Sequence, residues 1–241
     1  MLSNFIKMGD KIDLQAIDRS AGGQAENQKT YASSIYEIVS EDMLEIMMPV
    51  EKGKLILLPV DSEYNLVFYG EGGLYQCFAR IVDRYKSSNV YILVVELTSN
   101  LRKYQRREYY RFSCALDMCA RNLQEEELDS LDEIAPYDLT PGLPLKQSVI
   151  VDISGGGLRF LSSQMYEAGS MLYICYDLLI GDENRKYEVI GKVLSVKKLE
   201  NRTGTWEHRV QYYNMDKKVR EEIIKYIFEE ERKSRRKERF S

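Results

Sequence analysis

Hydrophobic and polar residues alternate with a period of two along most of this chain. The alternating runs are rich in β-branched and aromatic residues, and clusters of Gly, Asp, Asn and Ser separate them, as expected for short strands. In the first part of the chain the runs cover residues 11–17, 34–39, 54–60, 64–69, 74–82 and 90–97. We therefore predict an all-β first domain, a small barrel or sandwich, over residues 1–98.

The alternation resumes at residue 112 and ends in a helix. The later strand-like runs cover residues 112–120, 147–153, 158–162, 171–179, 187–196 and 206–213. Asp216 then stands at a position suited to an N-cap. The apolar residues that follow it have the three- and four-residue spacing of an amphipathic helix: Val219, Ile223, Ile224, Ile227 and Phe228. The sequence thus predicts a second domain over residues 112–241, a five- or six-stranded barrel closed by a helix at residues 216–238.

Two segments interrupt the strand pattern. Residues 99–111 are poor in apolar side chains and rich in arginine and lysine, with Glu108 as their one acid. We interpret this segment as a linker that carries a binding loop. Residues 122–145 hold seven acids and no base, together with three prolines and a glycine. This composition predicts a mobile acidic excursion outside the core.

Candidate binding chemistry lies just before the strand that opens the second domain and in a later turn. Arg106, Arg107 and Arg111 supply planar guanidinium groups that can grip phosphate, or the O6 and N7 edge of a guanine, with two hydrogen bonds each. Asp152 and Ser154 add a carboxylate and a hydroxyl on a turn whose three glycines permit positive φ and close backbone approach. Together these residues predict a site for a purine nucleotide.

The two motifs resemble a known paired signature. Arg107-x-x-x-Arg111 followed by Asp152-x-Ser154-x-x-Gly157 is similar to the motifs of PilZ domains, bacterial receptors for the second messenger cyclic di-GMP. Each half occurs by chance in many proteins, whereas their order, spacing and strand context together are specific. The whole chain also resembles the flagellar brake proteins of the YcgR type, in which an all-β amino-terminal domain precedes the PilZ barrel.

The resemblance implies a fold, a ligand and an output. The fold would be all-β, with two small β-barrel domains in tandem, the second a six-stranded PilZ barrel with a carboxy-terminal helix. Arg107 and Arg111 would contact the phosphates and guanines of cyclic di-GMP, Asp152 and Ser154 would bind guanine from the barrel, and Gly157 would form the turn. Ligand binding would change the orientation of the domains, and the partner would be a stator or rotor component of the flagellar motor.

Several alternatives stay open from the sequence. Arg106 precedes the arginine motif and resembles the type of PilZ protein that binds two intercalated ligand copies instead of one. The output could instead be polysaccharide synthesis or a transcriptional complex. The acids at 125–138 could compete with ligand for the arginine loop, or form only a solvated loop. The same arginines could serve a nucleotide-processing enzyme, although no clustered carboxylates accompany them. We favour a receptor that is not an enzyme.

Composition narrows the class of protein further. The chain has 241 residues and a formal net charge of −4, which argues against general nucleic-acid binding despite a basic tail at residues 232–239. No apolar run approaches the ~20 residues that span a bilayer, and residues 1–10 lack secretory-signal features, so we expect a cytoplasmic protein, recruited to the flagellar basal body if the resemblance holds. The four cysteines have no CxxC spacing and predict free thiols, with no metal site. His208 is predicted to be structural. The oligomeric state stays open.

Overall fold

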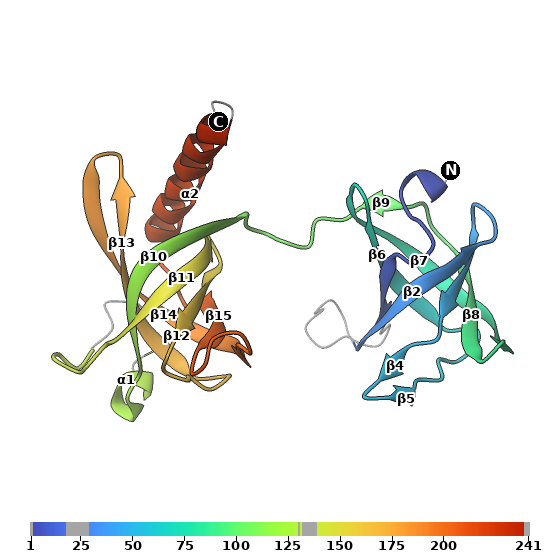
Figure 1. Ribbon diagram of the computed structural model, residues 1–241, viewed down its shortest axis with the longest axis horizontal. Helices are drawn as coiled ribbons and strands as arrows, with labels where there is room; N and C mark the ends of the chain where they lie inside the picture. Colours follow the sequence, from blue (N-terminus) through green and yellow to red (C-terminus); the bar gives the residue numbers. More distant parts are fainter. Residues whose placement is uncertain (1, 18–28, 130, 132–138, 239–241) are drawn as a thin grey trace. The chain divides into compact units, whose positions relative to one another are not determined.

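The computed structural model describes residues 2–17, 29–129, 131 and 139–238, and it divides into two compact units, Met1–Arg106 and Arg107–Ser241. The elements of the first unit are η1 (Leu2–Asn4), β1 (Lys11–Ala16), β2 (Thr30–Ile38), β3 (Met43–Met47), β4 (Val50–Glu51), β5 (Lys54–Leu55), β6 (Glu63–Gly70), β7 (Gly73–Ser87), β8 (Val90–Leu97) and β9 (Arg102–Lys103). The elements of the second unit are β10 (Arg111–Asn122), α1 (Glu125–Asp129), β11 (Lys146–Ser154), β12 (Gly157–Ser162), β13 (Met171–Ile180), β14 (Glu183–Lys198), β15 (Trp206–Tyr212) and α2 (Lys217–Glu238) (Figure 1).

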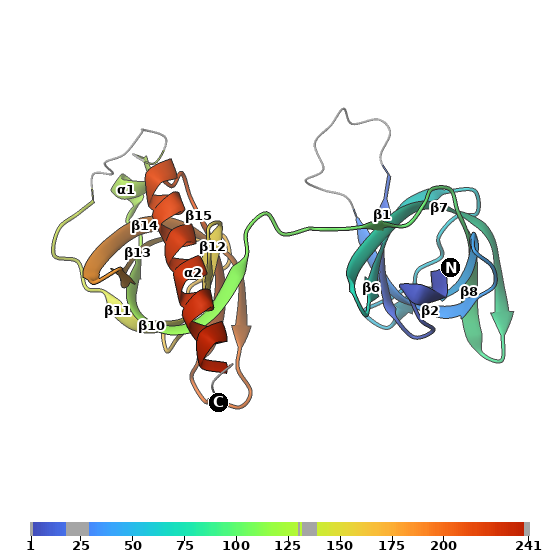
Figure 2. The same ribbon diagram turned by 90° about the horizontal axis from the view of Figure 1, so that it is seen from above.

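The first unit is a curled antiparallel sheet. Its strands follow the order β6-β1-β2-β3-β8-β7-β9, and an additional pairing between β6 and β7 closes six of them into a ring, with β9 paired to β7 (Figure 2). Alternate residues such as Leu14, Leu66 and Phe68 point into a fully buried core. Because β9 pairs with β7, the first unit extends past Thr98 into the segment that the sequence predicts to be a linker.

The strands of the first unit differ from the predicted pattern at two places. The run at 54–60 forms a strand only at Lys54–Leu55, because Pro59 cannot donate a ladder hydrogen bond and Leu58 packs into the core from an irregular segment. In contrast, β3 is a full strand of the sheet that the strand pattern does not predict. Its core side chains, Leu44 and Ile46, alternate with methionine and glutamate, which are weak strand formers.

The second unit is a closed six-stranded antiparallel barrel, with strand order β10-β11-β12-β15-β14-β13. This confirms the predicted all-β fold and the six-stranded barrel of the second domain. Ile150 and Phe160 are fully buried inside the barrel, among the alternate residues that fill it. The pairing of β10 with β13 closes the barrel along a short ladder, from Met118 opposite Tyr176 to Asn122 opposite Leu172.

Helix α2 covers one end of this barrel (Figures 1 and 2). The carboxylate of Asp216 accepts hydrogen bonds from the backbone N–H groups of Lys218 (2.8 Å) and Val219 (3.2 Å), which confirms the predicted N-cap. Ile223 and Ile227 of the predicted apolar face are buried in the barrel core, whereas Phe228 is 46% exposed.

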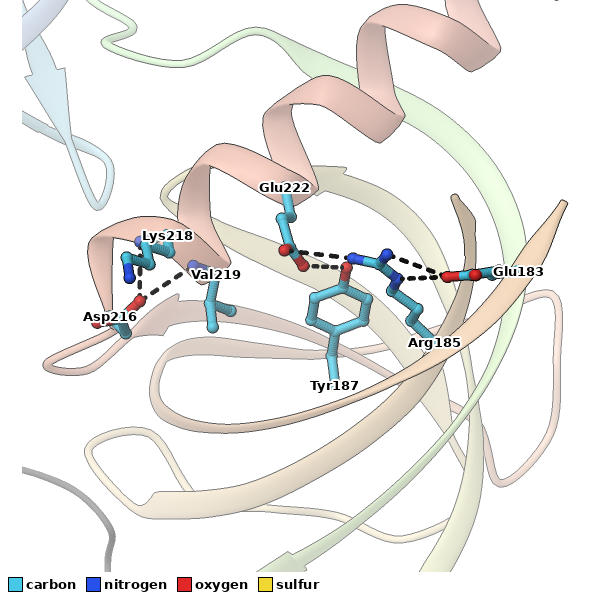
Figure 3. A network of polar contacts seen from close by, with 7 residues as sticks. All are labelled: Glu183, Arg185, Tyr187, Asp216, Lys218, Val219 and Glu222. Atoms are coloured by element: carbon cyan, nitrogen blue, oxygen red, sulfur yellow. Dashed lines mark hydrogen bonds and ion pairs between the residues drawn. The ribbon is translucent and has the colours of Figure 1, made fainter. Parts of the chain in front are cut away.

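A polar network also joins α2 to strand β14 (Figure 3). Glu222 accepts a hydrogen bond from the hydroxyl of Tyr187 at 2.8 Å, and its other oxygen lies 3.4 Å from the guanidinium of Arg185. Arg185 in turn pairs with Glu183 at 3.0 Å. Burial and the bond to Glu222 raise the pKa of Tyr187 to about 12, so its hydroxyl stays a donor at physiological pH.

The acidic stretch at 122–145 takes part in the core, contrary to the prediction of an excursion outside it. Leu123 and Leu131 are buried against Ile190 of β14. Helix α1 follows Leu123, so these apolar side chains anchor both of its ends to the barrel. Residues 130 and 132–138 of the predicted mobile segment lie outside the described residues.

Glu127, one of the seven acids, is buried in a salt bridge. Its two carboxylate oxygens lie 2.6 and 2.7 Å from the guanidinium of Arg121, on β10, and both side chains are less than a tenth exposed. The backbone N–H groups of Gln124 and Thr140 also donate to this carboxylate, each at 2.8 Å. Because both of its carboxylate oxygens are bound within the fold, Glu127 does not compete with ligand for the arginine loop.

We expect Glu127→Leu to lower the free energy of unfolding at pH 7 by about 3–5 kcal/mol, because the variant leaves the Arg121 guanidinium buried without its carboxylate. The double variant Arg121→Met/Glu127→Leu removes both charges and should recover most of this loss. Urea denaturation measures the difference. A double variant no more stable than the single one would contradict the pairing.

The dependence of the unfolding free energy on pH provides the control for this prediction. The hydrogen bonds from Arg121, followed by those from the backbone, hold the pKa of Glu127 at about 2, below its ordinary value of 4.5. Because the pKa is lower in the folded state, the stabilisation of about 3 kcal/mol is present above pH 4.5 and is lost as the pH falls towards 2. The double variant should lack this part of the acid sensitivity.

Candidate functional site

The candidate site is built on the hairpin formed by β11 and β12. Ser154 pairs with Gly157, so Gly155 and Gly156 form a two-residue turn between the strands. On the other side of β11, Arg111 lies directly opposite Ser154. The strand register therefore brings the end of the arginine motif next to the Asp-x-Ser-x-x-Gly motif, about forty residues later in the chain.

The Ser154 side chain holds the turn together. Its buried hydroxyl donates to the carbonyl oxygen of Gly157 at 3.0 Å and lies 3.4 Å from the backbone N–H of Gly156. A serine at this position thus replaces backbone hydrogen bonds that a tight turn leaves unmade. The Ser154 hydroxyl therefore already makes its contacts within the turn.

Gly155 and Gly157 are needed for space, and none of the three glycines for positive φ. None of Gly155, Gly156 and Gly157 lies in the left-handed region, so this part of the sequence prediction is wrong. Close approach is confirmed: a Cβ on Gly157 would lie 2.1 Å from the carbonyl oxygen of Val210 on β15. A Cβ on Gly155 would lie 2.6 Å from the ring of Tyr109.

Asp152 is part of an ion-pair network on the outer face of the barrel. Its carboxylate accepts a hydrogen bond from Nε of Arg159 at 2.6 Å, and Nη1 of Arg159 donates to Glu207 at 2.9 Å. Arg159 lies directly opposite Asp152 in the hairpin. Arg159 is not among the predicted site residues, although a two-residue turn between Ser154 and Gly157 already implies this pairing.

Tyr109 lies over the glycine turn and is held there by α2. Nη1 of Arg220 donates to the Tyr109 hydroxyl and to the carbonyl oxygen of Gly155, both at 3.2 Å, and its guanidinium lies 5.5 Å from the Tyr109 ring centroid. The next residue, Tyr110, stacks on Phe228 of the same helix with 6.4 Å between ring centroids. The loop between Arg107 and Arg111 is thus anchored on both the turn and the helix.

Arg220 lies outside both motifs, but its position in the sequence predicts a polar partner. Arg220 precedes Ile224 and Ile227 by four and seven residues, so it falls on the apolar stripe of α2. A basic residue on a buried stripe is expected to have a specific polar partner. Here the partners come from the glycine turn and the arginine loop.

The three predicted arginines lie in different surroundings. Arg107 and Arg111 are exposed and belong to the second unit, with Asp152, Ser154 and Gly157. The Arg111 guanidinium makes no hydrogen bond or ion pair with the residues that the structure describes.

Arg106 belongs to the first unit, where its Nη1 donates to the hydroxyl of Tyr69 at 2.9 Å. Its guanidinium also lies 5.6 Å from the Tyr69 ring centroid. The Tyr69 hydroxyl in turn donates to Asp13 at 2.6 Å. The chain therefore passes from one unit to the other between two adjacent arginines of the motif.

His208 packs inside the barrel, as the sequence predicts. It is fully buried, stacks on Phe160 with 4.6 Å between ring centroids, and accepts a hydrogen bond at Nε2 from the backbone N–H of Tyr166. Burial lowers its pKa to about 4, so it is neutral at physiological pH. Within residues 2–17, 29–129, 131 and 139–238, no three His, Cys, Asp or Glu side chains gather as a metal site, and no helix has the length and hydropathy to cross a membrane.

Two family models match the chain in tandem. Residues 7–97 match the model PilZNR, described as flagellar protein YcgR, and residues 105–229 match the model of the PilZ domain. The second match covers more than half of the chain and contains both motifs of the candidate site. This protein belongs to the PilZ domain family, with a YcgR-type amino-terminal domain.

Individual proteins are also similar to this chain. The chain is 24% identical over 211 residues to the "Uncharacterized protein YpfA" of Bacillus subtilis (strain 168), covering 85% of this chain and 87% of that one. The structure of the Bacillus subtilis inhibitor of motility (MotI/DgrA) matches 95% of this chain and 100% of its own, with a TM-score of 0.71 and 18% identity. The Escherichia coli YcgR structure in complex with c-di-GMP matches 95% of this chain and 87% of its own, with a TM-score of 0.45 and 14% identity. The B. subtilis structure shows that the fold is shared over the whole length.

We expect Gly157→Ala to destabilise the protein by about 1–3 kcal/mol in the absence of nucleotide, because the new methyl group meets the fixed backbone of β15. Gly156→Ala is the matched control. Its Cβ would first meet the Tyr109 side chain, at 3.0 Å, which can shift. Urea denaturation compares the two variants, and equal stabilities would contradict the packing role of Gly157.

Proposed function

We propose that this protein is a receptor for cyclic di-GMP and not an enzyme. The observation that carries the proposal is the register of β10 and β11, which sets Arg111 directly opposite Ser154. Membership of the PilZ family supports it, and the YcgR protein of Escherichia coli has been crystallised in complex with this nucleotide. The exposed arginines and the glycine turn then form one surface.

The chemistry of the site suits the ligand. Cyclic di-GMP carries two phosphates and two guanines, and an arginine can bind either group through two parallel hydrogen bonds. Arg107 and Arg111 are exposed, and the Arg111 guanidinium has no partner among the described residues, so it can bind ligand without breaking a contact of its own. Asp152 and Ser154 supply acceptors for the N–H donors of guanine.

Tyr109 and Arg220 extend the same surface. The Tyr109 ring lies over the turn that contains Gly155 and Gly156, within two residues of Arg107 and of Arg111. We infer that a guanine bound by these arginines meets the Tyr109 ring, and base–aromatic stacking contributes about 1–3 kcal/mol. Arg220 positions that ring through its hydrogen bond to the hydroxyl.

The position of the arginine loop explains how ligand binding would change the surface that a protein partner recognises. Residues 104–110 have no regular secondary structure and join the two units. Ligand wrapped by the loop that joins the units and held by the barrel would favour one orientation of the units over others, provided that its affinity differs between them. The partner we propose is a stator or rotor component of the flagellar motor, and the output is slower swimming.

Two findings support this output. The first domain matches a model described as a flagellar protein, and the fold of the whole chain is that of an inhibitor of motility. Pull-down of motor components with and without cyclic di-GMP tests the partner. Incubation of the protein with the nucleotide and a divalent metal ion tests the receptor against an enzyme, because a receptor returns the nucleotide intact and a phosphodiesterase yields the linear product.

We expect Arg107→Ala and Arg111→Ala each to weaken cyclic di-GMP binding by about ten- to a hundredfold or more, since each removes a bidentate contact of ~1–3 kcal/mol. Arg102→Ala is the matched control, an exposed arginine of β9 with the same charge change outside both motifs. Isothermal titration calorimetry measures the dissociation constants. Parent-like affinity in both site variants would show that the site is assigned wrongly.

The second expectation concerns stoichiometry. Arg106 would offset part of the four negative charges of two stacked ligands, so the parent should bind two molecules of cyclic di-GMP per chain. Arg106→Leu should reduce this number to one and keep binding, whereas Arg102→Leu should leave it at two. A parent titration that ends at one equivalent would contradict the role of Arg106.

A further inference from the structure

Cys119 and Cys175 face each other directly across the short ladder between β10 and β13. Their neighbours Ala120 and Ile174 are fully buried in the barrel core. Because side chains alternate between the two faces of a strand, both cysteines point to the outer face of the barrel. Neither cysteine belongs to the two motifs of the candidate nucleotide site.

The distance between opposite strand positions suits a covalent bond. Directly opposed residues of an antiparallel ladder have Cα atoms roughly 4.5–5.5 Å apart, and disulfides join Cα atoms roughly 4.4–6.8 Å apart. Both cysteines are free thiols, and both line the same surface hollow. No movement of the backbone is needed to bring them together.

The pair is open to small molecules. A surface hollow of about 260 Å³ is lined by both cysteines and by Asp177 and Lys186, among other residues. Cys119 is partly exposed. Burial raises the pKa of Cys175 most, and the positive charge of Lys186 opposes this rise. Cys175 is 8% exposed, so Cys119 is the more accessible thiol of the pair. Cys77 lies in the first unit, and Cys114 packs against the barrel core.

Two thiols without a third ligand define the chemistry of the site. No group of three or more metal-ligating side chains surrounds them among the described residues, so a closed zinc site is not formed. We propose that Cys119 and Cys175 form a dithiol modification site, which a low-molecular-weight disulfide oxidises to a cross-strand disulfide and which a trivalent arsenical bridges.

The oxidation is a double thiol–disulfide exchange. The Cys119 thiolate attacks one sulfur of the small disulfide, forms a mixed disulfide and releases one small thiol. The Cys175 thiolate then attacks the Cys119 sulfur, forms the protein disulfide and releases the second small thiol. Two electrons pass from the protein to the small disulfide, and the two cysteine protons end on the released thiols. Because the thiolates react, the rate rises with pH.

The disulfide would link β10 to β13 across the ladder that closes the barrel. It would join residues 119 and 175 across a long loop and so restrict the unfolded chain. We therefore expect oxidised protein to melt at least about 4 °C above reduced protein, with dithiothreitol reversing the change. Thermal unfolding of the full-length chain before and after treatment measures it.

Mass spectrometry decides between the proposal and its alternatives. The parent is incubated with oxidised glutathione at pH 8.5 and pH 6.5, and its intact mass and peptide map are recorded. The expected product has lost two hydrogen atoms, links the Cys119 and Cys175 peptides, and forms faster at pH 8.5. Glutathione adducts on separate cysteines, a link that involves Cys77 or Cys114, or an unchanged mass would overturn the proposal.

A matched pair of variants provides the control. Cys77→Ser/Cys114→Ser keeps the proposed pair, and it should still form the disulfide. It should also bind one equivalent of phenylarsine oxide, whose arsenic bonds to both sulfurs while its oxygen leaves as water with the two thiol protons. Cys119→Ser should lose both properties and retain a parent-like melting temperature under reducing conditions. Arsenical binding that persists in Cys119→Ser would also overturn the proposal, and the parent peptide map remains decisive if a variant fails to fold.

Discussion

The antiparallel ladder of β10, β11 and β12 is the constraint on which the candidate site depends. It sets Arg111 opposite Ser154 and Asp152 opposite Arg159, so residues from two distant motifs share one edge of the barrel. The ladder tolerates no added volume at Gly157, where the backbone of β15 lies against the turn. A one-residue slip in the register would turn these side chains to the opposite face.

The parts of the fold that sequence predicts well are those with local patterns. Strand alternation locates the strands of the barrel, and Asp216 with the apolar stripe after it locates the start and buried face of α2. The pairing of Asp152 with Arg159 could also have been predicted, because a two-residue turn after Ser154 fixes the opposite residues one by one. Strand β3 is harder, since it is short and a glutamate separates its two core residues.

Other features depend on contacts between distant segments and cannot be read from a local pattern. The hydrogen bond between Tyr109 and Arg220 joins residues more than a hundred positions apart. Arg121 and Glu127 are close in sequence, yet their burial depends on how the chain leaves β10 and packs Leu123 against the barrel. Glycine serves either positive φ or close packing, and only the structure shows that packing applies at Gly157.

The central claim is that the edge of the barrel at the glycine turn binds cyclic di-GMP, and nuclear magnetic resonance tests it most directly. Backbone amide spectra of the isotopically labelled protein are recorded as the nucleotide is added. The account predicts that the largest shifts belong to Gly155, Gly156 and residues 105–111, with Tyr109 among them. Shifts confined to other parts of the barrel, with these amides unchanged at saturation, would contradict it.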